Sequence, residues 1–376
     1  MTSEERHELR YQRRRAVRLE KRKRNAPHAD SYESVFSFGT LWRSYHNCRK
    51  NVAWKGSVQR YIFCAPVRVT QTYQKLAQDR YKCVIPHEWD TWERGKKRHI
   101  KSVPISERVM QRCLADNALV PALAPTFIYD NGACMKFKGY DFAQRRLTCH
   151  LSKYYREHGA NGYILLFDFS KFYDNVDHAL LLQALRKQFA DQRIMRMVRQ
   201  IIGTFGSTVG LGLGSQISQI LALLSANELD HAIKQDMRIR YYARYNDDGY
   251  LIHHSKEYLQ QCLKQIRELC AKLHIKLNEK KTQIVKLSHG FKFLKARVYL
   301  TETGRIVKKP PKERITIQRR KMKKLKKKLL NGQIDMPHIA IQYQSWRSTV
   351  KKYFRAWHTI RNMDSLYKAL YKEAAT

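Results

Sequence analysis

Residues 163–168, with the sequence YILLFD, predict the strand around which the rest of the fold is arranged. This run of apolar and aromatic residues follows a glycine and is too short for a helix of its own, so we expect a buried β-strand. The strand ends in the carboxylate of Asp168. A charge at the end of a buried strand is costly unless it has a partner. The run therefore predicts a core strand and marks Asp168 as a candidate functional residue.

A second acidic site, the pair Asp247-Asp248, occupies the same kind of position. Residues 239–245 and 249–253 resemble two strands joined by a tight turn, which predicts a hairpin with the acids at its tip. Carboxylate oxygens are ligands that Mg²⁺ prefers, and two such ions can hold both the attacking and the leaving oxygen of phosphoryl transfer. The competing interpretation is that these acids only cap turns. We expect metal-assisted chemistry on phosphates.

The remaining segments predict an α+β fold in which helices pack on an antiparallel sheet. Asp177 is expected to cap the helix that follows it. Residues 32–101 are rich in aromatic side chains and predict a compact but irregular region. Pro121 and Pro125 are expected to end the helix before them. The other expected helices are 105–119, 142–155, 193–203, 217–233, 259–273 and a basic set beyond 311, and the other expected strands are 275–277, 282–287 and 297–300.

The charge of the chain indicates a polyanionic partner. There are 73 Lys and Arg residues against 32 Asp and Glu, a formal charge of +41 at pH 7. Such a surplus favours nucleic acid or an acidic membrane surface. No apolar run approaches the ~20 residues of a transmembrane helix, so we expect nucleic acid and no membrane. Residues 1–30 predict a basic extension that is solvated or contacts nucleic acid.

The sequence predicts a cytoplasmic protein. Its first residues have no apolar signal core, and its eight cysteines have neither a CxxC pair nor zinc-ligand spacing. We therefore expect reduced thiols, with no disulfide and no zinc site.

Several motifs follow one another in a fixed order. They are FDFSKFYDNVDH (167–178), LGSQISQ (213–219), YNDD (245–248), LNEKKT (277–282) and FLK (293–295). In this order they resemble the motifs of bacterial retroelement reverse transcriptases. The resemblance implies an RNA-directed DNA polymerase that adds deoxynucleotides (dNTPs) to a primer 3′-hydroxyl. It also implies a right-hand polymerase fold, with fingers at 31–160, a palm at 161–298 and a basic helical thumb at 299–376.

The resemblance gives the acids catalytic roles. Asp168 and Asp247 are expected to bind Mg²⁺, with Mn²⁺ as the alternative, together with the backbone carbonyl of Phe169. Asp248 adds a third carboxylate to the metal site. Lys281 is expected to protonate the pyrophosphate leaving group or screen its charge; the alternative is a solvated lysine.

Other residues are expected to bind the substrate. Tyr173 lies where the family places an aromatic ring under the sugar, which would exclude a 2′-hydroxyl and so favour dNTPs; the alternative is a core aromatic residue. Gly214, Ser218 and Gln219 are expected to contact the nucleotide or the template. The triphosphate is expected to bind the basic residues Lys97, Arg98 and Lys101, which are alternatively general phosphate contacts.

Finer features resemble one branch of the family. The Ser218-Gln219 form resembles reverse transcriptases of diversity-generating retroelements, whereas Asn246 and Lys295-Ala296 depart from the usual family pattern. The implied partners are an RNA template and an RNA/DNA hybrid, with a structured noncoding RNA or a small accessory protein as additional partners. A phage-defence reverse transcriptase in a bacterial or phage-infected cell is the alternative.

Two other classes of function remain open. An RNA chaperone or maturase-like protein could keep the fold for binding alone, but the intact acid trio argues against it. An RNA-dependent RNA polymerase would use ribonucleotides, and Tyr173 argues against that. In the basic C-terminal region, Trp346 and Trp357 are expected to form the core of a small helical domain.

Overall fold

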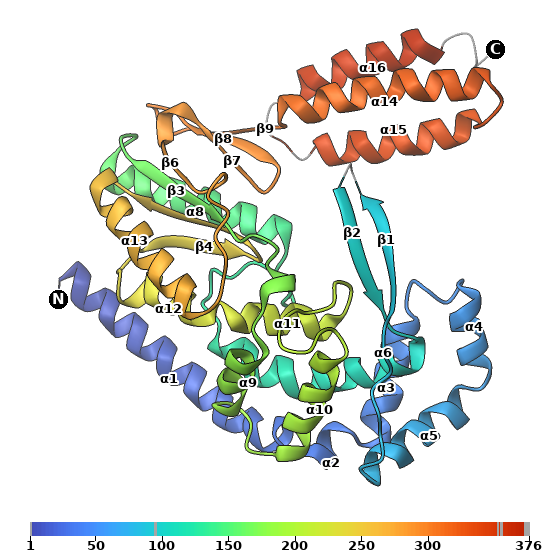
Figure 1. The fold of residues 1–376 in the computed structure, drawn as a ribbon. Coiled ribbons are helices and arrows are strands. Elements are labelled where there is room, and N and C mark those ends of the chain that lie inside the picture. Colours follow the sequence, from blue (N-terminus) through green and yellow to red (C-terminus); the bar gives the residue numbers. More distant parts are fainter. Residues whose placement is uncertain (1, 94–95, 352, 354–355, 372–376) are drawn as a thin grey trace. The chain divides into compact units, whose positions relative to one another are not determined.

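The computed structural model describes residues 2–93, 96–351, 353 and 356–371 (Figure 1). It divides into two compact units, each built from separate stretches of the chain. The first unit contains Met1–Ala143, Phe167–Gly249 and Gln261–Thr282. The second contains Gln144–Leu166, Tyr250–Gln260 and Gln283–Thr376.

The N-terminal part of the first unit is helical. The prediction of an irregular region over residues 32–101 was wrong, because its aromatic residues are spaced for helices: Leu41, Tyr45 and Cys48 are buried along one face of α3. A two-stranded antiparallel hairpin follows the helices. The elements are α1 (Ser3–Ala29), α2 (Tyr32–Val35), α3 (Phe38–Arg49), α4 (Gly56–Phe63), α5 (Ala65–Ala77), β1 (His87–Glu93) and β2 (Lys96–Ser102).

Pro121 does not end the helix that precedes it, contrary to prediction. Helix α6 (Ile105–Leu114) continues through the π-helical turn η1 (Ala115–Leu119) into α7 (Val120–Leu123), and the 3-10 turn η2 (Ala124–Thr126) closes the segment. Pro121 lies in the first turn of α7, where its missing N–H is tolerated. The long helix expected over 217–233 is likewise two helices, α11 (Gln216–Ser225) and α12 (Asn227–Gln235), separated at Ala226.

The predicted core strand is present as β3 (Tyr163–Asp168), whose central residues are fully buried. It belongs to a four-stranded sheet of order β4-β5-β3-β6, with β4 at Tyr241–Tyr245, β5 at Asp248–His253 and β6 at Gln283–Lys286. Strands β3 and β6 are antiparallel, with Leu165 opposite Ile284. The strand expected over 275–277 is only an isolated bridge between Leu277 and Phe169.

Helices accompany this sheet, so the predicted α+β fold with antiparallel strands is confirmed. Asp177 caps α9 as expected: its Oδ1 accepts a 3.0 Å hydrogen bond from the backbone N–H of Leu180. All eight cysteines are free thiols in the structure. The helices are α8 (Tyr140–His158), α9 (His178–Arg186), α10 (Gln192–Gly203) and α13 (Lys256–Lys272).

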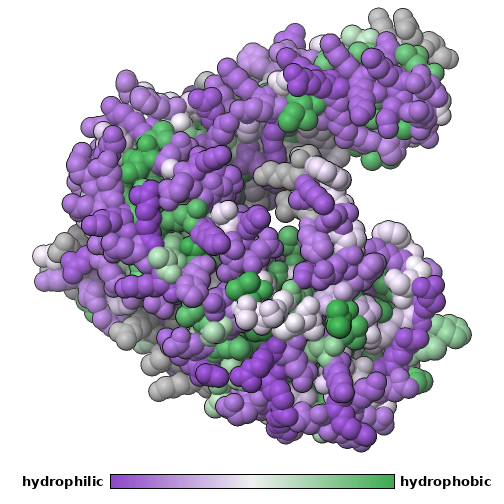
Figure 2. Space-filling view, in the orientation of Figure 1, coloured by the Kyte–Doolittle hydropathy of each residue, from purple (hydrophilic) through white to green (hydrophobic). Residues whose placement is uncertain are grey.

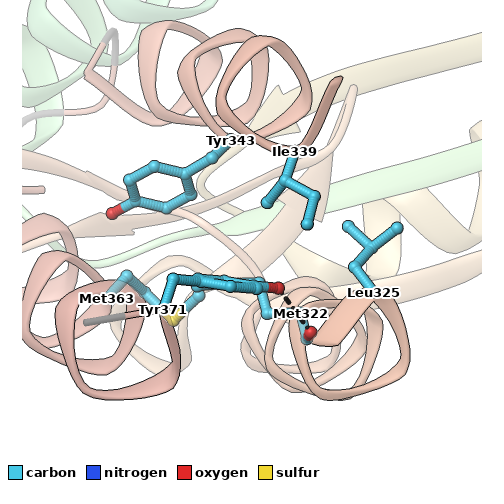
Figure 3. Close-up of a cluster of buried hydrophobic side chains, with 6 residues drawn as sticks. All are labelled: Met322, Leu325, Ile339, Tyr343, Met363 and Tyr371. Carbon is cyan, nitrogen blue, oxygen red and sulfur yellow. Dashed lines mark hydrogen bonds between the residues drawn. The ribbon is translucent and has the colours of Figure 1, made fainter. Parts of the chain in front are cut away.

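The C-terminal part of the second unit contains a small sheet and three basic helices. The strands are β7 (Phe291–Phe293), β8 (Ala296–Leu300) and β9 (Ile306–Lys309), and the helices are α14 (Lys312–Leu330), α15 (Met336–Lys351) and α16 (Trp357–Tyr371). The three helices share a core (Figure 3), and within it the Tyr371 hydroxyl donates a 2.7 Å hydrogen bond to the carbonyl of Met322. The core residues are Met322, Leu325, Ile339, Tyr343, Met363 and Tyr371.

Only one of the two tryptophans expected in this core takes part in it. Trp346 packs against the cluster, whereas Trp357 is 55% exposed. Trp357 precedes the buried Met363 by six positions, which puts it about 120° away around α16, off the buried face.

Hydrophilic residues cover most of the face seen in Figure 2. Across the part of the chain that the structure describes, none of the helices combines the length and the apolar character needed to cross a bilayer.

We expect Ile339→Ala to destabilise the α14–α16 core by about 2–5 kcal/mol, because it leaves a cavity at a side chain that is 1% exposed. Urea unfolding and hydrogen exchange of the α14–α16 amides would measure the loss. Ile341→Ala, on the same helix but 71% exposed, is the matched control. Equal stabilities for the two variants would contradict this packing.

Candidate active site

Asp168 is buried at the end of β3 and is held by two side chains from one later turn of the chain. Its Oδ1 pairs with the Lys281 ammonium at 2.7 Å, and its Oδ2 accepts a 3.0 Å hydrogen bond from the Asn278 amide. The backbone N–H of Asn278 also donates to the Asp168 carbonyl, at 2.7 Å. The carboxylate is therefore fixed on both oxygens. Asn278 lies within the LNEKKT motif, yet sequence reasoning did not select it as a site residue.

Asp247 and Asp248 form the tip of the β4–β5 hairpin, as the sequence predicts. Asn246 precedes them with φ 53°, in the left-handed region that Asn adopts more readily than most residues. The backbone N–H of Phe169 donates a 3.1 Å hydrogen bond to the carbonyl of Asp247. This bond ties the end of β3 directly to the hairpin tip, so the two acidic motifs meet.

The three carboxylates influence one another. Burial raises the pKa of Asp248 to about 7, with further contributions from the negative charges of Asp247 and Asp168. Burial also raises the pKa of Asp247, and the charge of Asp168 adds to it. For Lys281, partial burial acts to lower the pKa, but the hydrogen bond and charge of Asp168 outweigh it and the pKa is raised. The site thus concentrates negative charge that its one lysine does not balance.

This donor set fits a hard divalent cation, because it consists of carboxylate oxygens with an excess of negative charge. Asp168, Asp247 and Asp248 come from adjacent strand ends, so they could share such an ion. Over the described ranges, no three His, Cys, Asp or Glu side chains are already arranged as a metal-binding group. The ammonium of Lys281 lies on Asp168 in the position of a counter-ion.

A buried ion pair stabilises the β4–β5 hairpin. Arg244 is 1% exposed, and its guanidinium forms two hydrogen bonds with Asp230, at 2.6 and 2.7 Å. The guanidinium also donates a third hydrogen bond, to the carbonyl of Asn246 at 2.8 Å. The Tyr242 hydroxyl also donates to Asp230. Arg244 thus links α12 to the turn that carries the acids. Sequence reasoning missed this pair; the signal available was an arginine in an otherwise apolar strand.

Tyr173 lies close to the hairpin acids. It begins the short 3-10 turn η3 (Tyr173–Asn175), and its carbonyl accepts a 2.8 Å hydrogen bond from the N–H of Leu211. Burial raises the pKa of Tyr173, and the nearby charge of Asp247 contributes. The structure therefore brings Tyr173, the glycine-rich segment 210–214 and Asp247 close together.

The glycine-rich segment needs its glycines. Gly210 and Gly214 have φ values of 101° and 110°, which L side chains rarely adopt. A Cβ on Gly214 would lie 3.6 Å from the carbonyl of Lys101, so this loop runs beside β2. On the following helix, Ser218 is 1% exposed and its hydroxyl has no hydrogen-bond partner among the described residues, whereas Gln219 is exposed.

The candidate triphosphate-binding lysines already have acidic partners. Lys97 pairs with Asp90 at 2.8 Å, and Lys101 pairs with Glu88 at 2.9 Å. Lys101 also donates to the carbonyl of Phe205 at 2.6 Å. The side chain of Arg98 lies outside the described residues. A triphosphate would have to compete with Asp90 and Glu88 for these lysines.

Comparison with known proteins agrees with this geometry. Residues 88–298 match the family described as "Reverse transcriptase (RNA-dependent DNA polymerase)", a range that includes Asp168, Asp247, Asp248 and Lys281. No protein with a curated description matches the sequence.

The fold is similar to that of a Candida albicans telomerase solved in complex with a TWJ fragment of telomeric RNA. The TM-score is 0.50 at 13% identity, over 78% of this chain and 54% of that one. An apo telomerase of Candida tropicalis is similar with a TM-score of 0.44 and 14% identity, over 59% of this chain and 48% of that one. The chain spans about half the length of these structures. At such identity the likeness to the Candida albicans protein shows the fold alone, which agrees with the expected right-hand polymerase architecture.

We expect Arg244→Met to destabilise the protein by about 3–5 kcal/mol, because it leaves the charge of Asp230 buried without its partner. The double variant Arg244→Met/Asp230→Leu removes both charges and should recover most of that stability. Urea unfolding would measure both, with Arg199→Met on the exposed face of α10 as the control. A double variant as unstable as the single one would rule out the buried charge as the cause.

Proposed function

The chain belongs to the reverse transcriptase (RNA-dependent DNA polymerase) family, and we propose that it copies an RNA template into DNA by adding dNTPs to a primer 3′-hydroxyl. The observation that supports this proposal is the meeting of two acidic motifs that lie far apart in the sequence. The bond from Phe169 N–H to the Asp247 carbonyl joins them, and Lys281 and Asn278 hold Asp168.

In this proposal Asp168 and Asp247 hold Mg²⁺ or Mn²⁺ together with the carbonyl of Phe169. Asp248 supplies further negative charge. When bound, the ions would lower the pKa of the primer hydroxyl and stabilise charge on the phosphoryl group. The protein's own contribution is orientation: hydrogen bonds on both carboxylate oxygens keep Asp168 fixed before substrate arrives.

Lys281 screens charge in this proposal. A lysine is already protonated at neutral pH, and pairing with Asp168 raises the pKa of Lys281 further, so the ammonium is a weak proton donor and carries a positive charge. About half of the side chain is exposed, so the ammonium can leave Asp168 for a triphosphate when a metal ion takes its place. This favours screening of the pyrophosphate over its protonation.

Tyr173 is the proposed sugar gate. The backbone of Tyr173 is held by a hydrogen bond from the N–H of Leu211, and its side chain lies close to Asp247. In this proposal the sugar of the nucleotide approaches there. Gly214, Ser218 and Gln219 are proposed to contact the nucleotide or template. The unpartnered hydroxyl of Ser218 is consistent with that role only if the helix around it adjusts, because the residue is buried.

We further propose that the protein is a cytoplasmic enzyme of a prokaryotic, diversity-generating retroelement. The support for this is the Ser218-Gln219 form of the LGSQISQ motif (213–219). Its partners would be an RNA/DNA hybrid and a structured noncoding RNA or small accessory protein. A phage-defence enzyme is the alternative. A template/variable repeat pair beside the gene would support diversification, and an isolated gene with a noncoding RNA would support defence.

Asp247→Ala should lower dNTP incorporation by about 10²–10³-fold or more, because it removes a proposed metal ligand. The assay is DNA primer extension on an RNA template with Mg²⁺, and Asp236→Ala, an exposed acid outside the hairpin, is the control. RNA binding measured in parallel separates catalysis from fold. Incorporation unaffected by Asp247→Ala would refute the assigned site. Salt-sensitive RNA binding with no wild-type incorporation on several templates would favour a binding protein.

Tyr173→Ala should reduce the preference for dNTPs over ribonucleotides by about 10-fold or more, because the ring no longer opposes the 2′-hydroxyl. Single-nucleotide incorporation with each sugar gives the ratio. Tyr173→Phe keeps the ring and should keep the preference. A wild-type enzyme that prefers ribonucleotides would instead indicate an RNA polymerase.

A further inference from the structure

The first unit contains a cavity of about 340 Å³. Its lining residues are far in sequence from the carboxylates of the candidate active site. It is lined by α4, by the start of α5 and by the segment that joins β2 to α6. The lining residues from α4 and α5 all precede the range that matches the reverse transcriptase family. Its size is within the range of small-ligand pockets, about 300–1,000 Å³.

The cavity is lined by basic side chains and by no acidic one. Lys55, Arg60, Arg68 and Arg108 all contribute to its wall. Three of them contact neutral groups: Lys55 lies over the ring of Trp54 at 5.5 Å, Arg68 lies over the ring of Tyr61 at 5.7 Å, and Arg108 donates to the Ser102 hydroxyl at 3.4 Å.

These cations differ from the basic residues of the β1–β2 hairpin. Lys97 and Lys101 each pair with a carboxylate. Among the described residues, none of the four cavity cations forms such an ion pair. Positive charges around one cavity repel one another and attract an anion.

Two helices begin at the same cavity. Lys55 and Ser57 belong to the start of α4, and Pro104 and Ser106 to the start of α6. Neither helix has a side-chain cap on its first N–H groups. Uncapped helix N-termini carry partial positive charge and donate hydrogen bonds to anions.

Tyr61 provides an independent indication that the cavity accepts a polar ligand. The residue lines the cavity and is 1% exposed, and its hydroxyl has no hydrogen-bond partner among the described residues. A buried hydroxyl without a partner costs free energy. Burial raises the pKa of Tyr61 to about 12, so the group remains a hydroxyl that can donate to an anion.

We propose that this cavity binds a phosphate group, separately from the metal-dependent site at Asp168 and Asp247. Guanidinium and ammonium groups, the starts of two helices and Tyr61 line it, and these supply donors of the kind that phosphate oxygens prefer. The phosphate belongs either to a nucleic acid strand or to a free nucleoside polyphosphate. No cavity residue is a proposed catalytic residue, so the inference does not depend on the polymerase activity.

Calorimetric titration of the full-length protein tests this proposal, with EDTA present to suppress metal-dependent binding at the carboxylates. The probes are inorganic pyrophosphate, ATP, and a short single-stranded RNA with or without a 5′-phosphate. Arg60→Gln/Arg68→Gln should weaken binding of at least one probe by about tenfold or more, the loss expected for charged hydrogen bonds. The matched control is Lys75→Gln, an exposed cation on α5 outside the cavity.

Tyr61→Phe gives a second readout, because it removes the unpartnered hydroxyl without removing charge. It should weaken the same probe while the thermal unfolding temperature stays constant or rises. Weakened pyrophosphate and ATP binding would identify a free nucleotide as the source, and weakened RNA binding alone would identify a nucleic acid strand. Equal affinities of wild type, Arg60→Gln/Arg68→Gln and Tyr61→Phe for all probes would overturn the proposal, whatever the outcome of primer extension.

Discussion

The candidate site depends on a cluster of one buried and two half-buried carboxylates whose charge no single neighbouring cation neutralises. Asp168 is held by Lys281 and Asn278, and Phe169 N–H ties it to the carbonyl of Asp247. Burial and mutual repulsion raise the pKa of Asp247 and Asp248, so folding keeps these groups where their charge is unfavourable. A fold retains such an arrangement when a cation compensates for it, which agrees with the metal-dependent chemistry proposed for the family's acids.

The hairpin acids stay in place because a second, deeper interaction holds the turn. Arg244 is buried and pairs with Asp230, and it also binds the carbonyl of Asn246 at the start of the acidic turn. Breaking the pair would leave an uncompensated charge in a low-dielectric interior, so Arg244 is held in place, and its hydrogen bond to the Asn246 carbonyl anchors the turn. The turn that carries Asp247 and Asp248 is therefore stabilised by an ion pair as well as by apolar packing.

The sequence was sufficient for the local parts of the site and insufficient for the long-range ones. Residues 163–168 and the Asp247-Asp248 hairpin were predicted because apolar runs ending in acids have a local signature. Arg244 and Asp230 were missed because an arginine in an apolar strand does not by itself show that its side chain points inward to a partner on a helix. The helices over 32–77 were missed because aromatic residues obscured a helical spacing, and the break at Ala226 was missed because apolar residues continue on both sides of it.

The distribution of positive charge separates two kinds of basic residue. Cations such as Lys97 and Lys101 are paired with acids on the neighbouring strand, so a phosphate must displace Glu88 or Asp90 to reach them. Those around the α4–α6 cavity have neutral neighbours and need displace nothing. A net charge of +41 ensures that the protein attracts nucleic acid in general, but long-range attraction is screened by salt and does not position a strand. Positioning a strand requires hydrogen-bond donors that have no partner within the protein. In the first unit, the cavity lined by Tyr61 offers such donors.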